Sequence, residues 1–232
     1  MKILGIETST RTGSVALMDE ERLIAEYTLN LSQTHTSRLM PAIDQVLKDA
    51  CITINQVDGI AVSLGPGSFT GLRIGISTAK GLAQALSKPI VGIPTLDGLA
   101  FNLPYTTGII CPILDARKGE VYAALYESPD GNLKRLSDYV VCGPGKLMDE
   151  LQKFSASTII FLGDGVERYG GLITKSLGKS ALFAPKAMRL ASAGSIAELG
   201  LKKLKGSEGT NLFKVRPLYL RLSDAELKWQ ER

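Results

Sequence analysis

The stretch Gly65-Pro-Gly-Ser-Phe-Thr-Gly-Leu-Arg-Ile-Gly75 joins two segments of different character. Residues 59–64 before it form an apolar run of strand length, and residues 69–86 after it have the length and apolar spacing of a helix. Ser68 is a suitable N-cap, because its hydroxyl can accept a first-turn N–H of that helix. The sequence therefore predicts a strand, a tight turn and a helix, which places the chain in the α/β class.

The helix expected over residues 69–86 carries two patterns. Its apolar face recurs at steps of three or four, and its small residues recur at steps of four along Gly71, Gly75, Ala79 and Ala83. Each interior glycine costs a helix about 1 kcal/mol relative to alanine, so close approach of another backbone is the expected compensation. That backbone can belong to the chain's own core or to another subunit, and the pattern fits both.

A phosphate-binding turn is the competing interpretation of the Gly-Pro-Gly segment. A loop of the Walker type ends in Gly-Lys-Ser/Thr, whereas the corresponding region here reads Ser68-Phe69-Thr70, and Lys80 is the next lysine. The pattern favours close packing over phosphate binding.

Composition limits the class of protein. The 232 residues carry a net charge of +4, which permits contact with RNA without indicating it. Cys51, Cys111 and Cys142 are scattered without C-x-x-C spacing, which argues against a disulfide framework and a zinc site. No apolar run approaches the roughly 18 residues of a membrane helix, and no signal-peptide pattern begins the chain. We expect a soluble, cytoplasmic protein.

The pattern of elements repeats. Strands are expected over residues 2–6, 14–18 and 23–29 as an antiparallel meander, followed by a helix over 38–50 with Ser37 as its cap. Near Gly108 the pattern restarts with strands over 109–114, 121–126 and 133–136, a helix over 144–154 and a strand over 158–162. The sequence therefore predicts two α/β halves, an N-terminal lobe over 1–103 and a C-terminal lobe over 104–232.

The end of the chain supports three further expectations. A helix is expected near residues 191–205, and residues 218–220 suit a last strand. Ser223 to Glu226 has the form of a capping box for a short helix that would contain Trp229. The segment over about 213–232 is expected to pack back on the first lobe.

Candidate chemistry rests on two acidic residues at matching places. Glu7 and Asp115 each end the first strand of a half, where a pair of carboxylates could hold a magnesium nucleotide. The alternative is that both hydrogen-bond the adjoining turns. Arg117 and Lys118 follow Asp115 where close approach of phosphate would need glycines, although basic side chains can still bind phosphate as point charges.

Other catalytic classes lack the residues they need. His35 is the single histidine, which excludes a two-histidine metal site. No G-x-S-x-G motif surrounds a serine, so a serine hydrolase is disfavoured. We expect neither a catalytic set nor a metal site.

Four blocks in order, residues 3–10, 65–75, 113–122 and 163–165, resemble the TsaB family, also called YeaZ. The resemblance covers nearly the whole chain. It implies the two-lobed actin-like, sugar-kinase-like ATPase (ASKHA) fold, in agreement with the duplication.

The resemblance also implies a function. Members are accessory, non-catalytic subunits in forming threonylcarbamoyladenosine at the tRNA adenosine next to the anticodon. The catalytic paralogue TsaD, which has a histidine pair, is the implied partner, the ATPase TsaE joins the pair, and TsaC or its fused variant forms the adenylate. The implied subunit has no cofactor of its own and forms a homodimer when alone, and direct tRNA contact stays open.

Two sets of residues follow from the resemblance. The implied partner interface lies on the helices over 38–50 and 69–86 and comprises Arg38, Leu39, Ile43, Val46, Gly71, Leu72, Gly75, Ile76, Ala79 and Ala83. A vestigial nucleotide site would comprise Glu7, Ser9, Asp115, Arg117, Lys118, Gly163, Asp164 and Gly165. The second set motivates the alternative function, an ATP-dependent phosphotransferase or nucleotide-binding enzyme on the same fold. A peptidase has no candidate catalytic set in this chain.

Overall fold

The structure is a computed structural model that describes residues 1–30, 35–154, 157–206 and 212–221. The capping box expected at 223–226 and the helix expected around Trp229 lie outside these residues. Within them, no helix combines the length and apolar character needed to cross a membrane.

The first sheet has five strands in the order β3-β2-β1-β4-β5. They are β1 (Ile3–Glu7), β2 (Thr12–Met18), β3 (Leu23–Asn30), β4 (Gly59–Ser63) and β5 (Ile90–Ile93). The first three pair antiparallel, and β4 and β5 continue the sheet parallel to β1. The predicted meander and the strand before the Gly-Pro-Gly turn are confirmed.

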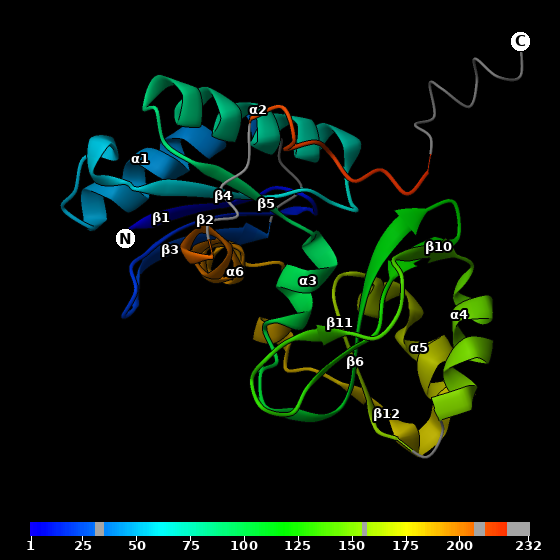
Figure 1. The fold of residues 1–232 in the computed structure, drawn as a ribbon. Helices are drawn as coiled ribbons and strands as arrows, with labels where there is room; N and C mark the ends of the chain where they lie inside the picture. The colour runs from blue at the N-terminus through cyan, green and yellow to red at the C-terminus, as the bar shows by residue number, and fades with distance from the viewer. Residues whose placement is uncertain (31–34, 155–156, 207–211, 222–232) are drawn as a thin grey trace, which may run out of the picture.

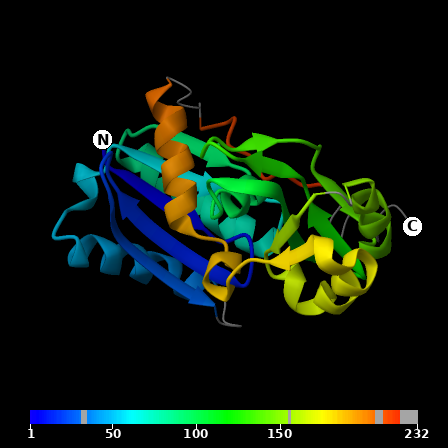
Figure 2. The same cartoon turned by 90° about the horizontal axis from the view of Figure 1, so that it is seen from below.

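Helices cover both faces of this sheet (Figures 1 and 2). The helices α1 (Leu39–Asp49) and α2 (Phe69–Ala85) lie on one face, and α6 (Ala193–Lys205) lies on the other. The predicted cap of α2 is confirmed, since the Ser68 hydroxyl accepts the Gly71 N–H at 3.3 Å. The predicted cap of α1 is wrong, because Ser37 ends the 3-10 turn η1 (His35–Ser37) and Arg38 occupies the N-cap position.

The second sheet repeats the order of the first as β10-β7-β6-β11-β12. Its strands are β6 (Thr106–Arg117), β7 (Glu120–Ala123), β10 (Val140–Cys142), β11 (Ile159–Leu162) and β12 (Ala181–Phe183). A hairpin of β8 (Tyr126–Ser128) and β9 (Lys134–Arg135) pairs with β6. This repetition agrees with the duplication expected from the sequence.

The second sheet is also covered on both faces. Buried residues of α4 (Pro144–Leu151) and α5 (Gly165–Leu177) pack on one side, against Cys111 and Ile113 of β6. On the other side Ile110 and Leu114 of β6 pack against α3 (Thr95–Ala100). Four short 3-10 turns complete the elements: η2 (Ile54–Gln56), η3 (Gln152–Phe154), η4 (Gly178–Ser180) and η5 (Lys186–Arg189).

Each sheet is covered in part by a helix from the other half of the sequence. Helix α3 lies within residues 1–103, yet Leu96 and Leu99 belong to the core of the second sheet. Helix α6 lies within residues 104–232, yet Ile196 and Ala197 pack against the first sheet. The ranges 1–103 and 104–232 therefore do not correspond one to one with the two layered units around the sheets.

Residues 212–221, here called the C-terminal strap, contain no strand, so the strand predicted over 218–220 is wrong. Val215 is buried in the core beneath α1 and α2, and the Leu218 N–H donates to the Leu64 carbonyl at 2.7 Å. At the end of the strap, Arg221 pairs with Glu120 of β7 at 3.3 Å. The strap therefore contacts both layered units.

Candidate functional site

The small-residue ridge of α2 packs against the end of β1. A Cβ atom on Gly71 would lie 2.0 Å from the Thr8 carbonyl oxygen, and one on Gly75 would lie 2.1 Å from Thr8 Oγ1. The Thr8 hydroxyl donates to the Gly71 carbonyl at 2.8 Å, which fixes this close approach. The backbone that the ridge accommodates is therefore the chain's own.

The residues proposed for a partner interface are largely enclosed by the chain itself. Arg38 is half-buried, and the other nine are buried: Leu39, Ile43, Val46, Gly71, Leu72, Gly75, Ile76, Ala79 and Ala83. The outward face of α1 and α2 is formed by other residues, which include Met40, Asp44, Gln45, Lys48, Arg73, Ser77, Gly81 and Gln84. A partner that docks on these helices in this conformation would contact these outward-facing residues.

Glu7 is the last residue of β1. Its side chain is fully buried between β4 and the turn that follows β1. Its Oε1 accepts hydrogen bonds from the Ser9 N–H and from the Ser63 hydroxyl. Burial raises the pKa of Glu7 to about 7, against the opposing effect of the hydrogen bonds from Ser9 and Ser63. Near neutral pH the carboxyl group is therefore divided between its protonated and charged forms.

Four buried side-chain oxygen atoms in the described chain have no hydrogen-bond partner: Glu7 Oε2, Ser9 Oγ, Thr95 Oγ1 and the Tyr169 hydroxyl. Ser9 adjoins the Gly-Pro-Gly turn, where its carbonyl accepts the Ser68 N–H at 2.7 Å. The sequence identified Glu7 and Ser9 but missed Ser63 and Thr95, because Ser63 ends β4, Thr95 begins α3 and neither lies in a motif.

In the second layered unit, Asp115, Asp164 and Arg168 form a connected group. The Asp115 N–H donates to Asp164 Oδ1 at 2.9 Å, and Arg168 pairs with Asp115 at 3.0 Å. Burial raises the pKa of Asp164, opposed mainly by that N–H bond and by the charge of Arg11. Arg168 was missed because the sequence did not predict α5, on whose first turns it lies.

The remaining residues of the predicted nucleotide site are divided between surface and packing roles. Arg117 at the end of β6 and Lys118 in the turn that follows are exposed, with φ values of 62° and 52°. A Cβ atom on Gly163 would lie 2.2 Å from the Ile113 carbonyl oxygen, and one on Gly165 would lie 3.0 Å from it. These glycines allow the turn before α5 to pack against β6.

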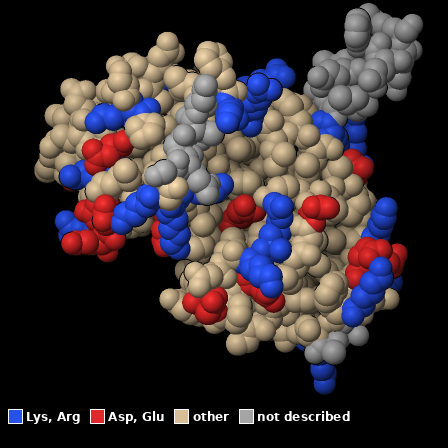
Figure 3. All heavy atoms as spheres, viewed as in Figure 1, with Lys and Arg blue, Asp and Glu red and all other residues tan. Residues whose placement is uncertain are grey.

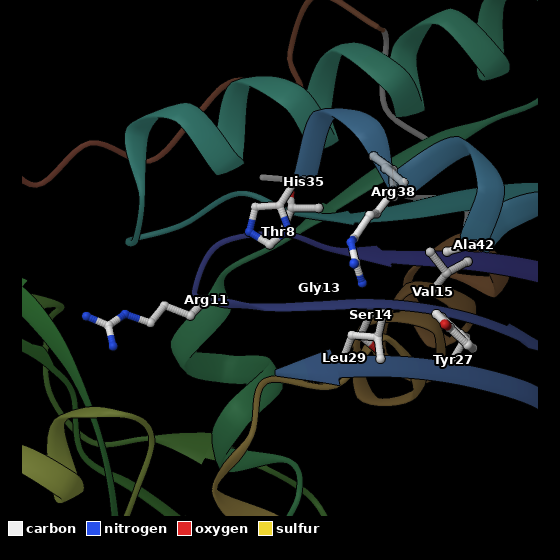
Figure 4. Close-up of a pocket in the computed structure, with 11 residues that line it drawn as sticks. Thr8, Arg11, Gly13, Ser14, Val15, Tyr27, Leu29, His35, Arg38 and Ala42 are labelled. Atoms are coloured by element: carbon white, nitrogen blue, oxygen red, sulfur yellow. The ribbon is translucent and has the colours of Figure 1, made fainter. Parts of the chain in front are cut away.

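The predicted site thus forms two separate groups. Glu7 and Ser9 are joined on the first sheet, whereas Asp115 and Asp164 are joined on the second. No hydrogen bond or ion pair links Glu7 with Asp115 in the described chain. The side chain of Arg11 extends from the β1–β2 turn toward the second half (Figure 4) and interacts electrostatically with Asp164.

A small pocket lies beside Thr8, between α1 and the strands β2 and β3 (Figure 4). Its free volume of about 40 Å³ is too small for a nucleotide. His35 lines it and fixes the β1–β2 turn, with its Nε2 2.8 Å from the Thr10 carbonyl oxygen. Arg38 extends from the start of α1 over the strands, beside Tyr27.

Charges of both signs are intermixed on the face shown in Figure 3, with neither sign forming an extended field. This agrees with the mild net charge of +4. Residues 1–30, 35–154, 157–206 and 212–221 contain no cluster of three or more His, Cys, Asp or Glu able to hold a metal ion.

Residues 23–229 match the family described as "TsaD: tRNA N6-adenosine threonylcarbamoyltransferase". A Bacillus subtilis protein named "tRNA threonylcarbamoyladenosine biosynthesis protein TsaB" is 37% identical over 232 residues, which is 100% of this chain and 99% of the relative. The chain belongs to the TsaB family.

Solved structures agree with the assignment to the TsaB family. A Pseudomonas aeruginosa protein described as similar to "peptidase YEAZ" superposes with a TM-score of 0.81 at 27% identity, over 95% of this chain and 99% of that one. A hexokinase of Thermus thermophilus superposes with a TM-score of 0.50 at 11% identity, over 89% and 100% of the two chains. The second likeness concerns the fold alone, and the predicted actin-like, sugar-kinase-like fold is confirmed.

Proposed function

We propose that this chain is a non-catalytic subunit needed for threonylcarbamoylation of the tRNA adenosine next to the anticodon, and that it acts by binding TsaD and helping to recruit TsaE. Its similarity to the Bacillus subtilis TsaB over the full chain supports the pathway. The match to the family described as TsaD supports a paralogous relationship between the subunits.

The state of Asp115 is the observation that supports a non-catalytic role. Its Oδ1 accepts the Arg117 N–H at 2.9 Å, and its Oδ2 accepts Arg168 Nη1 at 3.0 Å. The carboxylate that would hold a magnesium nucleotide is thus paired with a cation and a turn N–H of its own chain. A nucleotide would have to break these contacts before it could use Asp115.

The outward face of α1 and α2 is the surface that we assign to TsaD. Met40 on α1 is 50% exposed, so this face offers a partner an apolar contact. On α2, a Cβ atom on Gly81 would meet no atom within 4 Å, so a partner helix could approach this backbone closely. Both helices lie on the same face of the first sheet (Figure 1).

Reconstitution tests the proposed role. Labelled threonine would be transferred to unmodified tRNA with bicarbonate, ATP, the adenylate-forming enzyme, TsaD and TsaE, with and without this chain. We expect product formation to depend on this chain and to persist with Glu7→Gln and Asp115→Asn. Transfer that does not depend on the chain would contradict the proposed function.

A matched pair of glycine variants tests the surface. Gly81 on α2 and Gly171 on α5 are both exposed in helices, and a Cβ on either meets nothing within 4 Å. We expect Gly81→Leu to weaken TsaD binding at least tenfold in a titration, while Gly171→Leu leaves it unchanged. If both variants bound TsaD equally well, α2 would not be part of the interface.

One observation favours the alternative of an ATP-dependent phosphotransferase or nucleotide-binding enzyme. Glu7 Oε2 and Ser9 Oγ are buried without partners, as groups awaiting a ligand would be. ATP turnover by the chain alone, abolished by Glu7→Gln, would support this alternative. Loss of threonylcarbamoyl transfer in the same variant, with TsaD binding intact, would give the site a role within the complex.

A further inference from the structure

Within the described chain, the backbone passes between the two layered units at three places. Pro94 follows β5 of the first sheet and leads into α3, which packs in the core of the second sheet. Ala191 belongs to the core of the second sheet, and Ser192 leads from it into α6 on the first sheet. The C-terminal strap is the third crossing, because Val215 is buried with the first sheet and Leu220 packs with the second.

The crossings at Pro94 and Ser192 are tied to each other by one side chain. Asn102 lies two residues after the end of α3, and its Nδ2 donates to the Met188 carbonyl at 3.0 Å and to the Leu190 carbonyl at 2.9 Å. Its Oδ1 accepts the hydroxyl of Ser195 on α6 at 2.6 Å. Two linked crossings of this kind form a hinge, because the two units can turn about the line that joins them.

The strap crosses on the opposite face of the first sheet from α6. Val215 is buried beneath α1 and α2, whereas Ser192 begins the helix that covers the other face. Figure 1 shows the strap, in orange and red, running from α2 toward the second half of the molecule, with α3 and α6 below it. A third connection away from the line between two hinge crossings opposes rotation about that line. The strap is therefore placed to control the hinge.

The strap is held closely on the first unit. Besides the hydrogen bond from the Leu218 N–H to Leu64, the Leu218 carbonyl oxygen would lie 3.0 Å from a Cβ atom on Gly65. The ring of Tyr219 stacks on that of Phe69 at the start of α2, with centroids 4.5 Å apart. The backbone and a side chain of the strap thus both contact the segment that joins β4 to α2.

The attachment to the second unit is weaker. It consists of the packing of Leu220 and the 3.3 Å ion pair of Arg221 with Glu120. Arg221 is largely buried, yet its Nε has no hydrogen-bond partner in the described chain. An unpaired buried N–H group lowers the net gain from burying the guanidinium. The strap should therefore detach from the second unit before it detaches from the first.

We propose that the C-terminal strap is a latch, which holds the two layered units at one relative orientation and whose release at Arg221 lets them turn about the crossings at Pro94 and Ser192. Closed, the latch fixes the separation between the Glu7 group on the first sheet and the Asp115 group on the second.

Distances between two spin labels, measured by double electron–electron resonance, test the latch in the full chain. One label is attached to the exposed Cys51 in the first unit and the other to Lys175→Cys, an exposed position on α5 in the second. Cys142 is replaced by serine so that it takes no label, and Cys111 is buried.

Two strap variants and one control are compared with the wild type in this labelled background. Arg221→Gln removes the charge of the ion pair and leaves the rest of the strap unchanged, whereas Tyr219→Ala weakens the attachment to α2. The matched control is Lys134→Gln, which breaks the 2.8 Å ion pair with Glu127 inside the second unit. Far-ultraviolet circular dichroism confirms that each variant is folded.

We expect one narrow distance distribution for the wild type and for Lys134→Gln. In Arg221→Gln we expect a distribution at least twice as wide, and Tyr219→Ala should widen it as well. Narrow distributions in both strap variants, a wild type as wide as Arg221→Gln, or equal widening in Lys134→Gln would each overturn the latch. The measurement uses neither TsaD nor tRNA, so its outcome is independent of the proposed function.

Discussion

Gly75 of α2 faces the side chain of Thr8 so closely that an added Cβ would lie 2.1 Å from Thr8 Oγ1. This contact joins the helix to the end of β1, immediately after Glu7. Glycine lowers the helix propensity of α2 at Gly71, Gly75 and Gly81. The close approach of Thr8 explains why glycine is needed at the first two of these positions.

We expect Gly75→Ala to destabilise the fold by about 3 kcal/mol, because helix and strand must separate to admit a methyl group. The control Gly81→Ala, on the open side of the same helix, should stabilise it by about 1 kcal/mol. Urea denaturation of both variants measures the difference. The larger change Gly75→Leu would disrupt the same packing, so it cannot test partner binding in a folded chain.

Glu7 makes stability depend on pH. Its pKa is about 7 in the fold and 4.5 as its ordinary value, so the folded state retains a proton that the unfolded state releases. Its contribution is fully present below pH 4.5 and is lost as the pH rises through 7, with an upper limit of about 3 kcal/mol. In the wild type, the free energy of unfolding measured by denaturation should be lower at pH 8 than at pH 5. This difference should be smaller in Glu7→Gln. An identical pH dependence in the two proteins would contradict this assignment.

Asp97 attaches α3 to the second sheet through two phenol groups. It accepts the Tyr126 hydroxyl at 2.7 Å and the Tyr139 hydroxyl at 2.8 Å. Since the side chain of Tyr126 is buried, Asp97→Ala would leave its hydroxyl unpaired, at a cost of about 2–3 kcal/mol. In a double-mutant cycle, Asp97→Ala should cost less in a Tyr126→Phe background. Additive effects would show that this bond contributes nothing to stability.

Tyr219 fastens the C-terminal strap to α2. Its ring stacks on Phe69 with centroids 4.5 Å apart, and its hydroxyl accepts Arg73 Nε at 3.0 Å. Tyr219→Ala should cost about 1 kcal/mol and should accelerate tryptic cleavage after Lys214. The exposed Tyr105, changed to alanine, is the matched control, for which we expect no acceleration at that bond. Unchanged cleavage in Tyr219→Ala would mean that other contacts hold the strap.

The sequence predicted most elements whose pattern is local. The first meander, the Ser68 cap and α2 follow from alternation, turn chemistry and helical spacing. Helix α5 was missed because Gly165, Gly170 and Gly171 lower its propensity, although Val166 and Ile173 supply an apolar face at helical spacing. Helix α3 has only six residues, too few for a periodic signal.

The candidate site was predicted less well because its determinants are not local. The small-residue ridge on α2 has the same spacing whether it faces Thr8 or another subunit. The pairing of Asp115 with Arg168 joins residues 53 positions apart, on a strand and on a helix that the sequence did not predict. Neither relationship leaves a signal in a single sequence, because each depends on how the elements pack.

The placement of α3 and α6 also determines how the chain can be divided. Fragments cut between residues 103 and 104 would each carry the cover helix of the other fragment's sheet and would leave an apolar face of their own sheet exposed. Separately, each would aggregate or remain unfolded, whereas together each could supply what the other lacks. The two halves are therefore suited to a split-protein reporter, in which folding reports that the two fragments have bound each other.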